Sequence, residues 1–218
     1  MIYTVVVDRF IATNCYIYAS DKTKRGWIID PGAEADKLLR FVADKGITIE
    51  KILLTHGHFD HISAAPQLQQ AWGGIEICMQ KNGCQYAQNP QWNLSAMNGE
   101  PVVLDHVTYI EDDSEIVLSD DDSMRVRMLP VPGHTSDGCL YYSEADGVAF
   151  VGDSVFRDSY GRTDMYGGDE ETLLHSIVAN VLTLPDDTVL LNGHTEPTTV
   201  GYEKKQPWYQ PYLGVKNK

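Results

Sequence analysis

The segment Thr55 to His61 constrains this 218-residue chain more than any other part of its sequence. It reads Thr-His-Gly-His-Phe-Asp-His, which places three imidazoles and one carboxylate at positions 56 to 61. It directly follows Lys51 to Leu54, a short apolar run that predicts a buried strand. Imidazole and carboxylate ligands together suit zinc, iron or manganese. The segment therefore predicts a metal site at the end of a strand.

Three further strand ends carry a glycine followed by a potential metal ligand. Each pair follows an apolar run that predicts a strand: Gly133-His134 after 124–129, Gly152-Asp153 after 148–151, and Gly193-His194 after 188–191. Glycine permits a sharp backbone turn that can point the next side chain into a cleft. Because the ends of neighbouring strands can converge on one place, we expect these side chains to join the first cluster.

The candidate metal ligands are then five histidines and two aspartates: His56, His58, Asp60, His61, His134, Asp153 and His194. Seven ligands are too many for one tetrahedral zinc. They suit two metal ions that share a bridging carboxylate, roughly 3.5 to 4 Å apart in such sites. The two remaining histidines follow no such pattern. We expect His106 on the surface and His175 along a helix near the end of the chain.

Apolar runs predict ten strands, at 3–7, 15–18, 27–29, 51–54, 75–78, 116–118, 124–129, 140–142, 148–151 and 189–191. Apolar spacing predicts helices over 35–45, about 62–72, and 170–182. The segment 82–99 is rich in Gln and Asn and is expected to be a long loop or a short irregular helical insertion near the mouth of the site. The tail 206–218 is expected to pack on the body as a strap. This order of elements predicts a layered α/β or α+β domain.

Composition narrows the class of protein. Apolar residues make up 43% and charged residues 22%, which is typical of a globular protein, and we expect one domain over residues 1–218. The net charge of −14 argues against nucleic acid as a partner, because phosphate binding needs clustered Lys and Arg. The N-terminal residues lack the pattern of a signal peptide, and no apolar run approaches the ~20 residues that span a bilayer, so a cytoplasmic protein without a membrane partner is expected. The four cysteines form no Cys-x-x-Cys pair and are expected to be free thiols.

With these motifs, the chain resembles a metallo-β-lactamase-fold hydrolase. It resembles most closely the short glyoxalase II-like branch, the hydroxyacylglutathione hydrolases. The resemblance covers essentially the whole chain. It rests on the segments 13–16, 29–32, 55–61, 132–135, 152–156, 161–164, 193–194 and 197–199. The metal motif is highly specific for the fold and much less specific for the substrate.

The resemblance implies an α+β fold, a four-layer αβ/βα sandwich with the metals at one edge between the two sheets. It implies that His56, His58 and His134 hold one metal ion, that Asp60, His61 and His194 hold the second, and that Asp153 bridges them. The family uses zinc, iron or manganese, and we expect two divalent ions, with zinc as the first choice. The loop 133–138 departs from the pattern of relatives, which commonly have Pro-Gly or Gly-Ser after the Thr.

The expected reaction is attack of a metal-activated hydroxide on the carbonyl of a thioester or ester. Asp60 is expected to be catalytic by orienting the nucleophile. Asp30 can orient a ligand histidine, or serve only the turn Asp30-Pro31-Gly32, or do both. Arg162 is expected to brace the metal loops, and the role of Arg157 stays open between bracing and binding an anionic group. The partner is a small-molecule thioester or ester, and the sequence sets no oligomeric state.

Four alternatives remain. A persulfide dioxygenase would use one iron held by two histidines and an aspartate, and a lactonase would cleave acylated lactones. A nuclease conflicts with the charge of −14. A non-catalytic scaffold has no need of seven metal ligands. Full-length glyoxalase II enzymes place glutathione-binding residues in a helical C-terminal extension, whereas this sequence has about 24 residues after His194.

Overall fold

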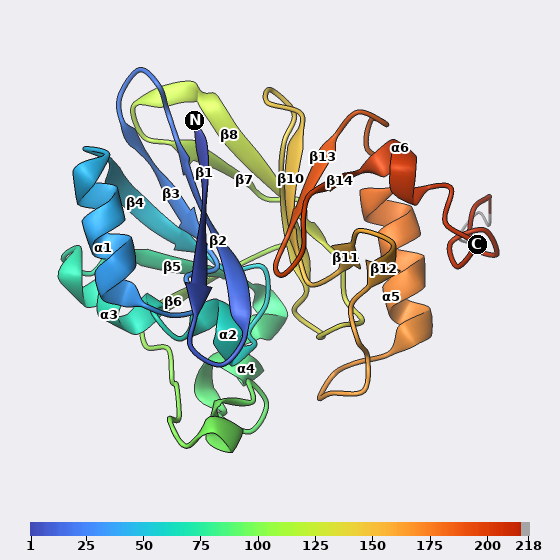
Figure 1. The fold of residues 1–218 in the computed structure, drawn as a ribbon, viewed down its shortest axis with the longest axis horizontal. Coiled ribbons are helices and arrows are strands. Elements are labelled where there is room, and N and C mark those ends of the chain that lie inside the picture. Colours follow the sequence, from blue (N-terminus) through green and yellow to red (C-terminus); the bar gives the residue numbers. More distant parts are fainter. Residues whose placement is uncertain (215–218) are drawn as a thin grey trace.

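Two six-stranded β-sheets form the centre of the computed structural model, which describes residues 1–214 (Figure 1). The first sheet has the order β1 (Ile2–Asp8), β2 (Ala12–Ala19), β3 (Arg25–Ile29), β4 (Thr48–Leu53), β5 (Glu76–Gln80) and β6 (Val107–Ile110). The second has the order β14 (Thr198–Thr199), β13 (Val189–Asn192), β10 (Val148–Gly152), β9 (Cys139–Ser143), β8 (Asp121–Pro130) and β7 (Glu115–Leu118). A small hairpin, β11 (Val155–Phe156) and β12 (Ser159–Tyr160), stands apart from both sheets.

Helices cover the outer face of each sheet and complete four layers. The first sheet carries α1 (Ala35–Asp44), α2 (Phe59–Ile62) and α3 (Ala65–Ala71), whereas the second carries α5 (Glu170–Ser176), which continues into the π-helical turn η3 (Ile177–Val181) (Figure 1). Shorter elements are η1 (Lys81–Gly83), α4 (Cys84–Gln88), η2 (Ser95–Asn98) and α6 (Val200–Glu203). The expected α+β, four-layer αβ/βα sandwich is confirmed. Every helix within residues 1–214 is too short or too polar to span a bilayer.

Three hydrophobic clusters separate the four layers. One lies between α1, α3 and the first sheet and includes Leu38, Leu68 and Ile52. The middle cluster lies between the two sheets and includes Trp27, Leu53 and Phe150. The third lies between the second sheet and α5 and includes Val151, Leu173 and Ile177. Ile52 and Leu53 are neighbours in β4 but belong to different clusters. Successive side chains of a strand point to opposite faces, so the first sheet packs against apolar residues on both faces.

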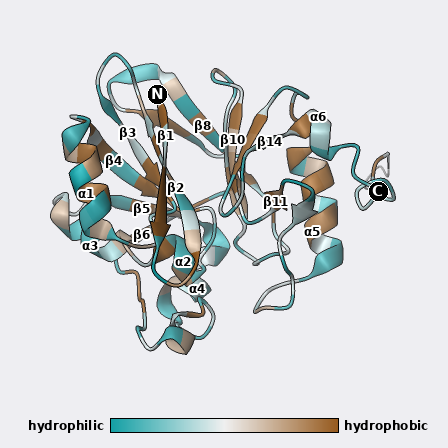
Figure 2. Ribbon diagram, in the orientation of Figure 1, coloured by the Kyte–Doolittle hydropathy of each residue, from teal (hydrophilic) through white to brown (hydrophobic). Residues whose placement is uncertain are grey.

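The same alternation explains why apolar runs predict these strands well. A strand that is buried on both faces carries few polar residues, and β3 and β10 are of this kind. Figure 2 shows β10 largely in the hydrophobic colour, whereas α1 alternates between hydrophilic and hydrophobic colours along its turns, as an amphipathic helix does. All ten expected strands are present. The edge strand β6 was not expected, because it is only partly buried and carries no continuous apolar signal.

Two helix expectations differ from the structure. The helix expected over 62–72 is split into α2 and α3, and α2 begins three residues earlier, at Phe59. Pro66 stands in the first turn of α3, where its missing N–H costs nothing, and this position favours a new helix start over a continuous helix. The helix expected over 170–182 is α-helical only to Ser176 and then widens into η3.

The remaining expectations concern the segment 82–99 and the tail. The segment forms the irregular helical insertion of η1, α4 and η2. The tail packs on the third hydrophobic cluster through the fully buried Tyr209 and the partly buried Trp208 and Tyr212. The expected strap is therefore present for residues 206–214, and residues 215–218 lie outside the described part of the chain.

Candidate metal centre

The fold brings all seven candidate ligands to one edge of the two sheets. Strand β8 runs antiparallel to β9, β9 antiparallel to β10, and β10 parallel to β13. The C-terminal ends of β8, β10 and β13 therefore point to the same edge, which is where His134, Asp153 and His194 follow them. From the first sheet, the end of β4 supplies His56 and His58, and α2 supplies Asp60 and His61.

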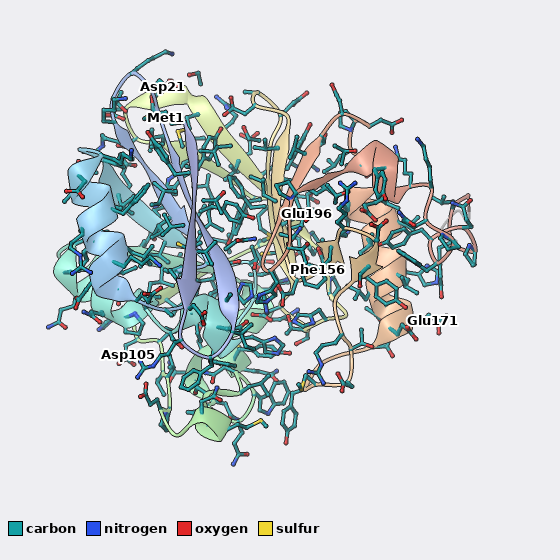
Figure 3. All side chains as sticks on the ribbon, in the orientation of Figure 1. Met1, Asp21, Asp105, Phe156, Glu171 and Glu196 are labelled. Atoms are coloured by element: carbon teal, nitrogen blue, oxygen red, sulfur yellow. The ribbon has the colours of Figure 1, made fainter. Side chains whose placement is uncertain are left out.

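The seven side chains form two groups that can each hold a metal ion. One group is His56, His58 and His134, and the other is Asp60, His61, Asp153 and His194. Within each group the potential ligand atoms all lie within 4.8 Å of one another. Figure 3 shows nitrogen-bearing side chains gathered between the two halves, close to the labelled Phe156. Phe156 packs against His194, with ring centroids 6.0 Å apart.

Three of the histidines are oriented through their Nδ1 atoms. His61 Nδ1 lies 2.9 Å from Asp30 Oδ2, His134 Nδ1 lies 2.6 Å from the Arg162 carbonyl oxygen, and His194 Nδ1 lies 2.8 Å from the Ala12 carbonyl oxygen. A proton on Nδ1 then leaves Nε2 as the atom with a free lone pair. This is how proteins commonly fix the tautomer of a metal-binding histidine.

Several buried ligand atoms in the two groups have no hydrogen-bond partner. Among the residues that the structure describes, they are His56 Nε2, His61 Nε2 and Asp153 Oδ1, whereas His58 faces the first group through Nδ1, which lies 2.9 Å from His134 Nε2. An unpaired polar atom in a protein interior costs roughly 1 to 3 kcal/mol, so a cluster of such atoms requires an explanation. Nitrogen and carboxylate atoms facing one another at this spacing fit a transition-metal ion as the missing partner.

Asp153 lies between the two groups. Its Oδ2 atom is 3.0 Å from His194 Nε2 and 3.8 Å from His134 Nε2, while its Oδ1 atom is 3.3 Å from His61 Nε2. Asp60 faces the second group only, with Oδ2 3.3 Å from His194 Nε2 and 3.7 Å from His61 Nε2. The carboxylate of Asp153 is therefore the one that can reach ligand atoms of both groups.

The electrostatic surroundings differ between the two groups. Burial, together with the neighbouring histidines, lowers the pKa of His58 to about 3 and holds the pKa of His56 well below its usual value. Burial also opposes a charge on His194, but the hydrogen bonds to Asp153 and Asp60 raise its pKa to about 10. The first group is thus uncharged, whereas in the second group the carboxylates of Asp60 and Asp153 hold protons on His61 and His194 that a metal ion would displace. Both kinds of surroundings favour a cation.

Asp30 contacts His61, which agrees with its expected role beside a ligand histidine. It follows β3 in a left-handed backbone conformation with φ of 51°. Its Oδ1 accepts a hydrogen bond from the Thr55 backbone N–H at 2.8 Å, and its Oδ2 accepts one from the Thr55 hydroxyl at 2.6 Å. Asp30 therefore ties the end of β3 to the start of the histidine segment. The hydrogen bonds of the Asp30 carboxylate go to Thr55 and His61, and these contacts support the orienting role.

The two arginines that follow Asp153 have different surroundings. The backbone carbonyl of Arg162 receives the His134 bond, so this residue braces a metal loop through its main chain. Its guanidinium instead pairs with Asp164 at 2.7 and 2.8 Å. Arg157 lies 3.4 Å from Glu196 and stacks over the ring of Tyr202. Both guanidinium groups are engaged by the protein itself.

The expectations for the two other histidines are confirmed. His106 is exposed on the chain segment before β6. His175 lies on α5, half-exposed, 3.9 Å from Glu171. Neither belongs to the two groups of potential ligands.

Sequence reasoning missed Asp137, a buried carboxylic acid beneath the first group. Burial raises its pKa to about 7, although the Thr135 hydroxyl and the backbone N–H groups of Asp137 and Gly57 act in the opposite direction. A Cβ atom on Gly57 would lie 2.2 Å from Tyr86 Cβ and 3.2 Å from Asp137 Oδ2, so these two side chains fill the space behind the His56-Gly57-His58 turn. The available signal was the glycine between two histidines, which indicates close packing at that point.

Comparison with known proteins agrees with the class that this fold and site define, a two-sheet sandwich with a histidine–aspartate metal centre. The sequence profile described as the Metallo-beta-lactamase superfamily matches residues 8–194. The chain therefore belongs to the metallo-beta-lactamase superfamily.

Relatives of similar length support this membership. A probable metallo-hydrolase of Bacillus subtilis is 36% identical, with 93% of each chain covered. A protein of Haemophilus influenzae described as a hydroxyacylglutathione hydrolase is 34% identical, with 94% of each chain covered. Each match covers nearly the whole length of this chain and of the relative, so the similarity is not confined to the metal-binding segments.

Solved structures with the same fold include a B3 metallo-beta-lactamase and a protein in a di-iron-bound form. The first is 31% identical with a TM-score of 0.86 and covers 96% of this chain and 99% of its own. The second is 28% identical with a TM-score of 0.81 and covers 94% of this chain and 99% of its own. Both structures share the fold of this chain over nearly its whole length.

Proposed function

We propose that this protein hydrolyses a thioester or ester bond with the help of two divalent metal ions. The observation that carries the proposal is the pair of ligand groups, with unpartnered atoms, that face each other across Asp153. One ion would be held by His56, His58 and His134, the other by Asp60, His61 and His194, and Asp153 would contact both. The relative described as a hydroxyacylglutathione hydrolase, which cleaves a thioester, supports this reaction class.

Zinc is the proposed metal, with iron and manganese as alternatives. Imidazole nitrogen and carboxylate oxygen suit all three ions, and the absence of a thiolate from both groups removes the strongest preference for zinc. The similar protein in a di-iron-bound form supports iron as a real alternative. Metal analysis of the purified protein decides between them.

Bound at these positions, a pair of cations would supply hydroxide near neutral pH, because it lowers the pKa of a coordinated water from ~15.7 towards ~7. The chain's own contribution is to place and hold the reacting groups. Asp60, whose side chain is 10% exposed, presents Oδ2 next to His194 Nε2 and is proposed to orient the nucleophile. A thiolate leaves with less help from an acid than an amine does, which fits a site without a separate general acid.

The partner is proposed to be a small molecule, and residues 1–218 are proposed to act as one domain. The middle hydrophobic cluster joins the two sheets, and both sheets contribute ligands. The net charge of −14 argues against nucleic acid as a substrate.

The test measures metal content and turnover on the same preparation. Two metals per chain are expected, with hydrolysis of simple thioesters or esters within a panel that also holds S-lactoylglutathione, lactones and a β-lactam. The variant His58→Ala should lose at least one metal and at least about a hundredfold in kcat/KM, because one ion loses a ligand. The exposed His106→Ala serves as the matched control and should retain both properties.

Two results would contradict the proposal. If His58→Ala kept normal metal content and hydrolysis, the two-metal scheme would be wrong. If the protein instead held one iron per chain and consumed oxygen with a persulfide, it would be a dioxygenase on the same fold.

A further inference from the structure

The hairpin of β11 and β12 contacts the metal centre at both of its ends. Its first strand begins directly after Asp153 and Ser154. Its second strand ends directly before Gly161, where a Cβ atom would lie 1.9 Å from the Asp153 carbonyl oxygen and 3.2 Å from His134 Nδ1. The carbonyl oxygen of the next residue, Arg162, accepts the hydrogen bond from His134 Nδ1. The position of the hairpin therefore affects both Asp153 and His134.

A third candidate ligand lies against the side of the hairpin. Phe156 on β11 packs on the ring of His194, with centroids 6.0 Å apart. The Nε2 atom of this ring faces Asp60 and Asp153, and its Nδ1 atom faces the Ala12 carbonyl oxygen. A ring that is held at both nitrogens can still tilt about the line between them, and Phe156 limits this tilt. All three candidate ligands from the second sheet thus border the hairpin.

The hairpin forms a two-stranded sheet of its own, so contacts with other elements must fix it. Its tip, Arg157-Asp158, contacts α6 and the turn that follows α6. The Tyr202 hydroxyl donates a hydrogen bond to Asp158 Oδ1 at 2.7 Å, and the Gln206 amide donates another at 3.0 Å. The guanidinium of Arg157 stacks over the Tyr202 ring, 4.7 Å from its centroid. These contacts hold Asp158 in a left-handed conformation with φ of 59°.

Glu203, the last residue of α6, joins the hairpin tip to the second sheet. It is fully buried, and its Oε1 accepts hydrogen bonds from the Thr198 hydroxyl at 2.6 Å and the Asp158 backbone N–H at 3.4 Å. Thr198 lies on β14, directly after the turn that carries His194. Within residues 1–214 the Oε2 atom of Glu203 has no hydrogen-bond partner. A buried carboxyl group is costly, and this one is placed where a single oxygen contacts both the hairpin and the strand after His194.

The segment around α6 is fixed to the core of the protein, so it can act as a rigid support. Val200 and Tyr209 are fully buried in the third hydrophobic cluster. Trp208 packs on Tyr160 of β12, with ring centroids 6.0 Å apart. In Figure 1, α6 and the hairpin both lie on the side of the second sheet that carries α5.

We propose that Tyr202 and Glu203 are positioning residues of the metal centre: they hold the tip of the hairpin, and the hairpin sets the orientation of His194 and Asp153 toward the second metal ion. The inference rests on the proposed two-metal function and goes beyond it, because it gives α6 a role in ordering the ligands. Groups at a catalytic site have to be held within about 0.5 Å of their productive positions, so a small displacement of the hairpin is enough to matter.

The experiment measures metal binding and catalysis on three variants of the full chain. Glu203→Ala removes the acceptor for Thr198 and Asp158, whereas Glu203→Gln keeps an acceptor oxygen. Tyr202→Phe removes the hydroxyl and keeps the ring beneath Arg157. Competition with a chromogenic chelator gives the affinity of each metal position, and the visible spectrum of the cobalt(II)-loaded protein reports the geometry of its ligands. Kinetics with a simple thioester give kcat and KM.

Glu203→Ala should lower the affinity of the second metal position and kcat about tenfold each, with KM unchanged, because partners that orient metal ligands are worth about 10- to 100-fold. Its cobalt spectrum should change as well. Tyr202→Phe should show the same effects at about fivefold, roughly the worth of one hydrogen bond. Glu203→Gln should stay close to the native protein in all three measurements.

Tyr212→Phe is the matched control, because Tyr212 belongs to the same tail but packs against His175 on α5, with ring centroids 4.6 Å apart. The change keeps the ring, and the affinity, the spectrum and the kinetics should all remain native.

A purely structural role would give a different result. It would lower the melting temperature of Glu203→Ala and leave the affinity, the cobalt spectrum and kcat of the folded variant unchanged, which would overturn the inference. Should Glu203→Ala fail to fold, Tyr202→Phe decides, because Tyr202 is 37% exposed and its loss of a hydroxyl is mild. Native affinity and a native spectrum in Tyr202→Phe would then overturn the inference.

The proposed function fails on a separate observation. A native protein that holds two metals and hydrolyses neither thioesters nor esters would contradict that function. The affinity and the cobalt spectrum would still test the positioning role, since neither measurement depends on turnover.

Discussion

A histidine binds a metal ion through one ring nitrogen. The hydrogen bond that the other ring nitrogen makes decides which of the two has a free lone pair. In this protein a carboxylate orients His61, whereas backbone carbonyls orient His134 and His194. The carboxylate differs from the carbonyls because it also makes the imidazole a better electron donor. Asp30 thus has the largest influence on the second group among these orienting partners.

Replacing Asp30 by Asn should therefore weaken metal binding without removing a ligand. We expect the affinity of the second metal to fall about 10- to 100-fold, the range measured for comparable partners, with a parallel fall in kcat. Competition with a chromogenic chelator measures the affinity. Asp36→Asn is the matched control, because Asp36 lies on α1 and its carboxylate bonds only Gln67. Equal affinities for Asp30→Asn and the native protein would show that Asp30 serves the turn alone.

At the scale of the elements, each ligand after a second-sheet strand depends on the glycine before it, but for different reasons. Gly133 and Gly152 have φ of 127° and 51°, in the region where other residues are strained. Gly193 is required for space, since a Cβ atom there would lie 2.2 Å from Asp153 Oδ1 and 2.6 Å from His61 Cε1. The expectation of a sharp turn thus holds for the first two glycines, which are also closely packed against Leu173 and Thr55, and close packing alone explains the third.

The substitution Gly193→Ala should consequently displace Asp153 and His61 and empty the second metal position. We expect loss of about one metal per chain and at least a hundredfold loss of activity, while the far-ultraviolet circular dichroism spectrum stays native. Gly147→Ala provides the control, because nothing lies within 4 Å of a Cβ atom there and only its φ of 61° is unfavourable. That control should cost about 1 kcal/mol of stability and no metal. Full metal content in Gly193→Ala would contradict the packing argument.

The sequence predicted strands and helices correctly where a single apolar pattern ran through the whole element. It failed where a second requirement, such as a proline or a metal-ligand position, interrupted that pattern. Strands such as β3 and β10 are buried on both faces, so their apolar runs are unambiguous. The split between α2 and α3 depends on a proline in the first turn of α3 and on the need of the metal centre for Asp60 and His61 at a helix start. An apolar pattern records neither requirement, because it reports burial and not the direction of a backbone turn.

At the scale of the whole molecule, the metal centre joins two halves that otherwise meet through the middle hydrophobic cluster. Four candidate ligands come from the first half of the chain and three from the second. Metal bound between them would favour the folded state by mass action, since the unfolded chain has no preformed site. It would also offset the mutual repulsion of the carboxylates at the centre.

Removal of the metals should therefore lower the thermal stability of the whole domain. Free metal at 1,000 times its dissociation constant stabilises by about 4 kcal/mol, which for a chain of this length corresponds to a fall in Tm of about 10 °C on chelation. Differential scanning calorimetry before and after a chelator measures it, and restored metal should reverse it. His58→Ala should respond less, because it starts with less metal. An unchanged Tm in protein shown to be metal-free would mean that the centre contributes nothing to folding.

The sequence by itself determined the set of candidate ligands and its division among strand ends, because ligand chemistry and the apolar strands before it are local properties of the chain. The order of the expected elements left an α/β and an α+β layered domain open, and the resemblance to the family implied the four-layer sandwich. Only the tertiary structure decided which nitrogen of each imidazole faces the centre, that Asp137 lies buried beneath the first group, and that the arginines around the site are paired with acids. Each of these depends on contacts between segments far apart in the chain. For the same reason, the pocket that Asp60 lines forms only where the β1–β2 loop, α2 and the segment 98–102 come together in space.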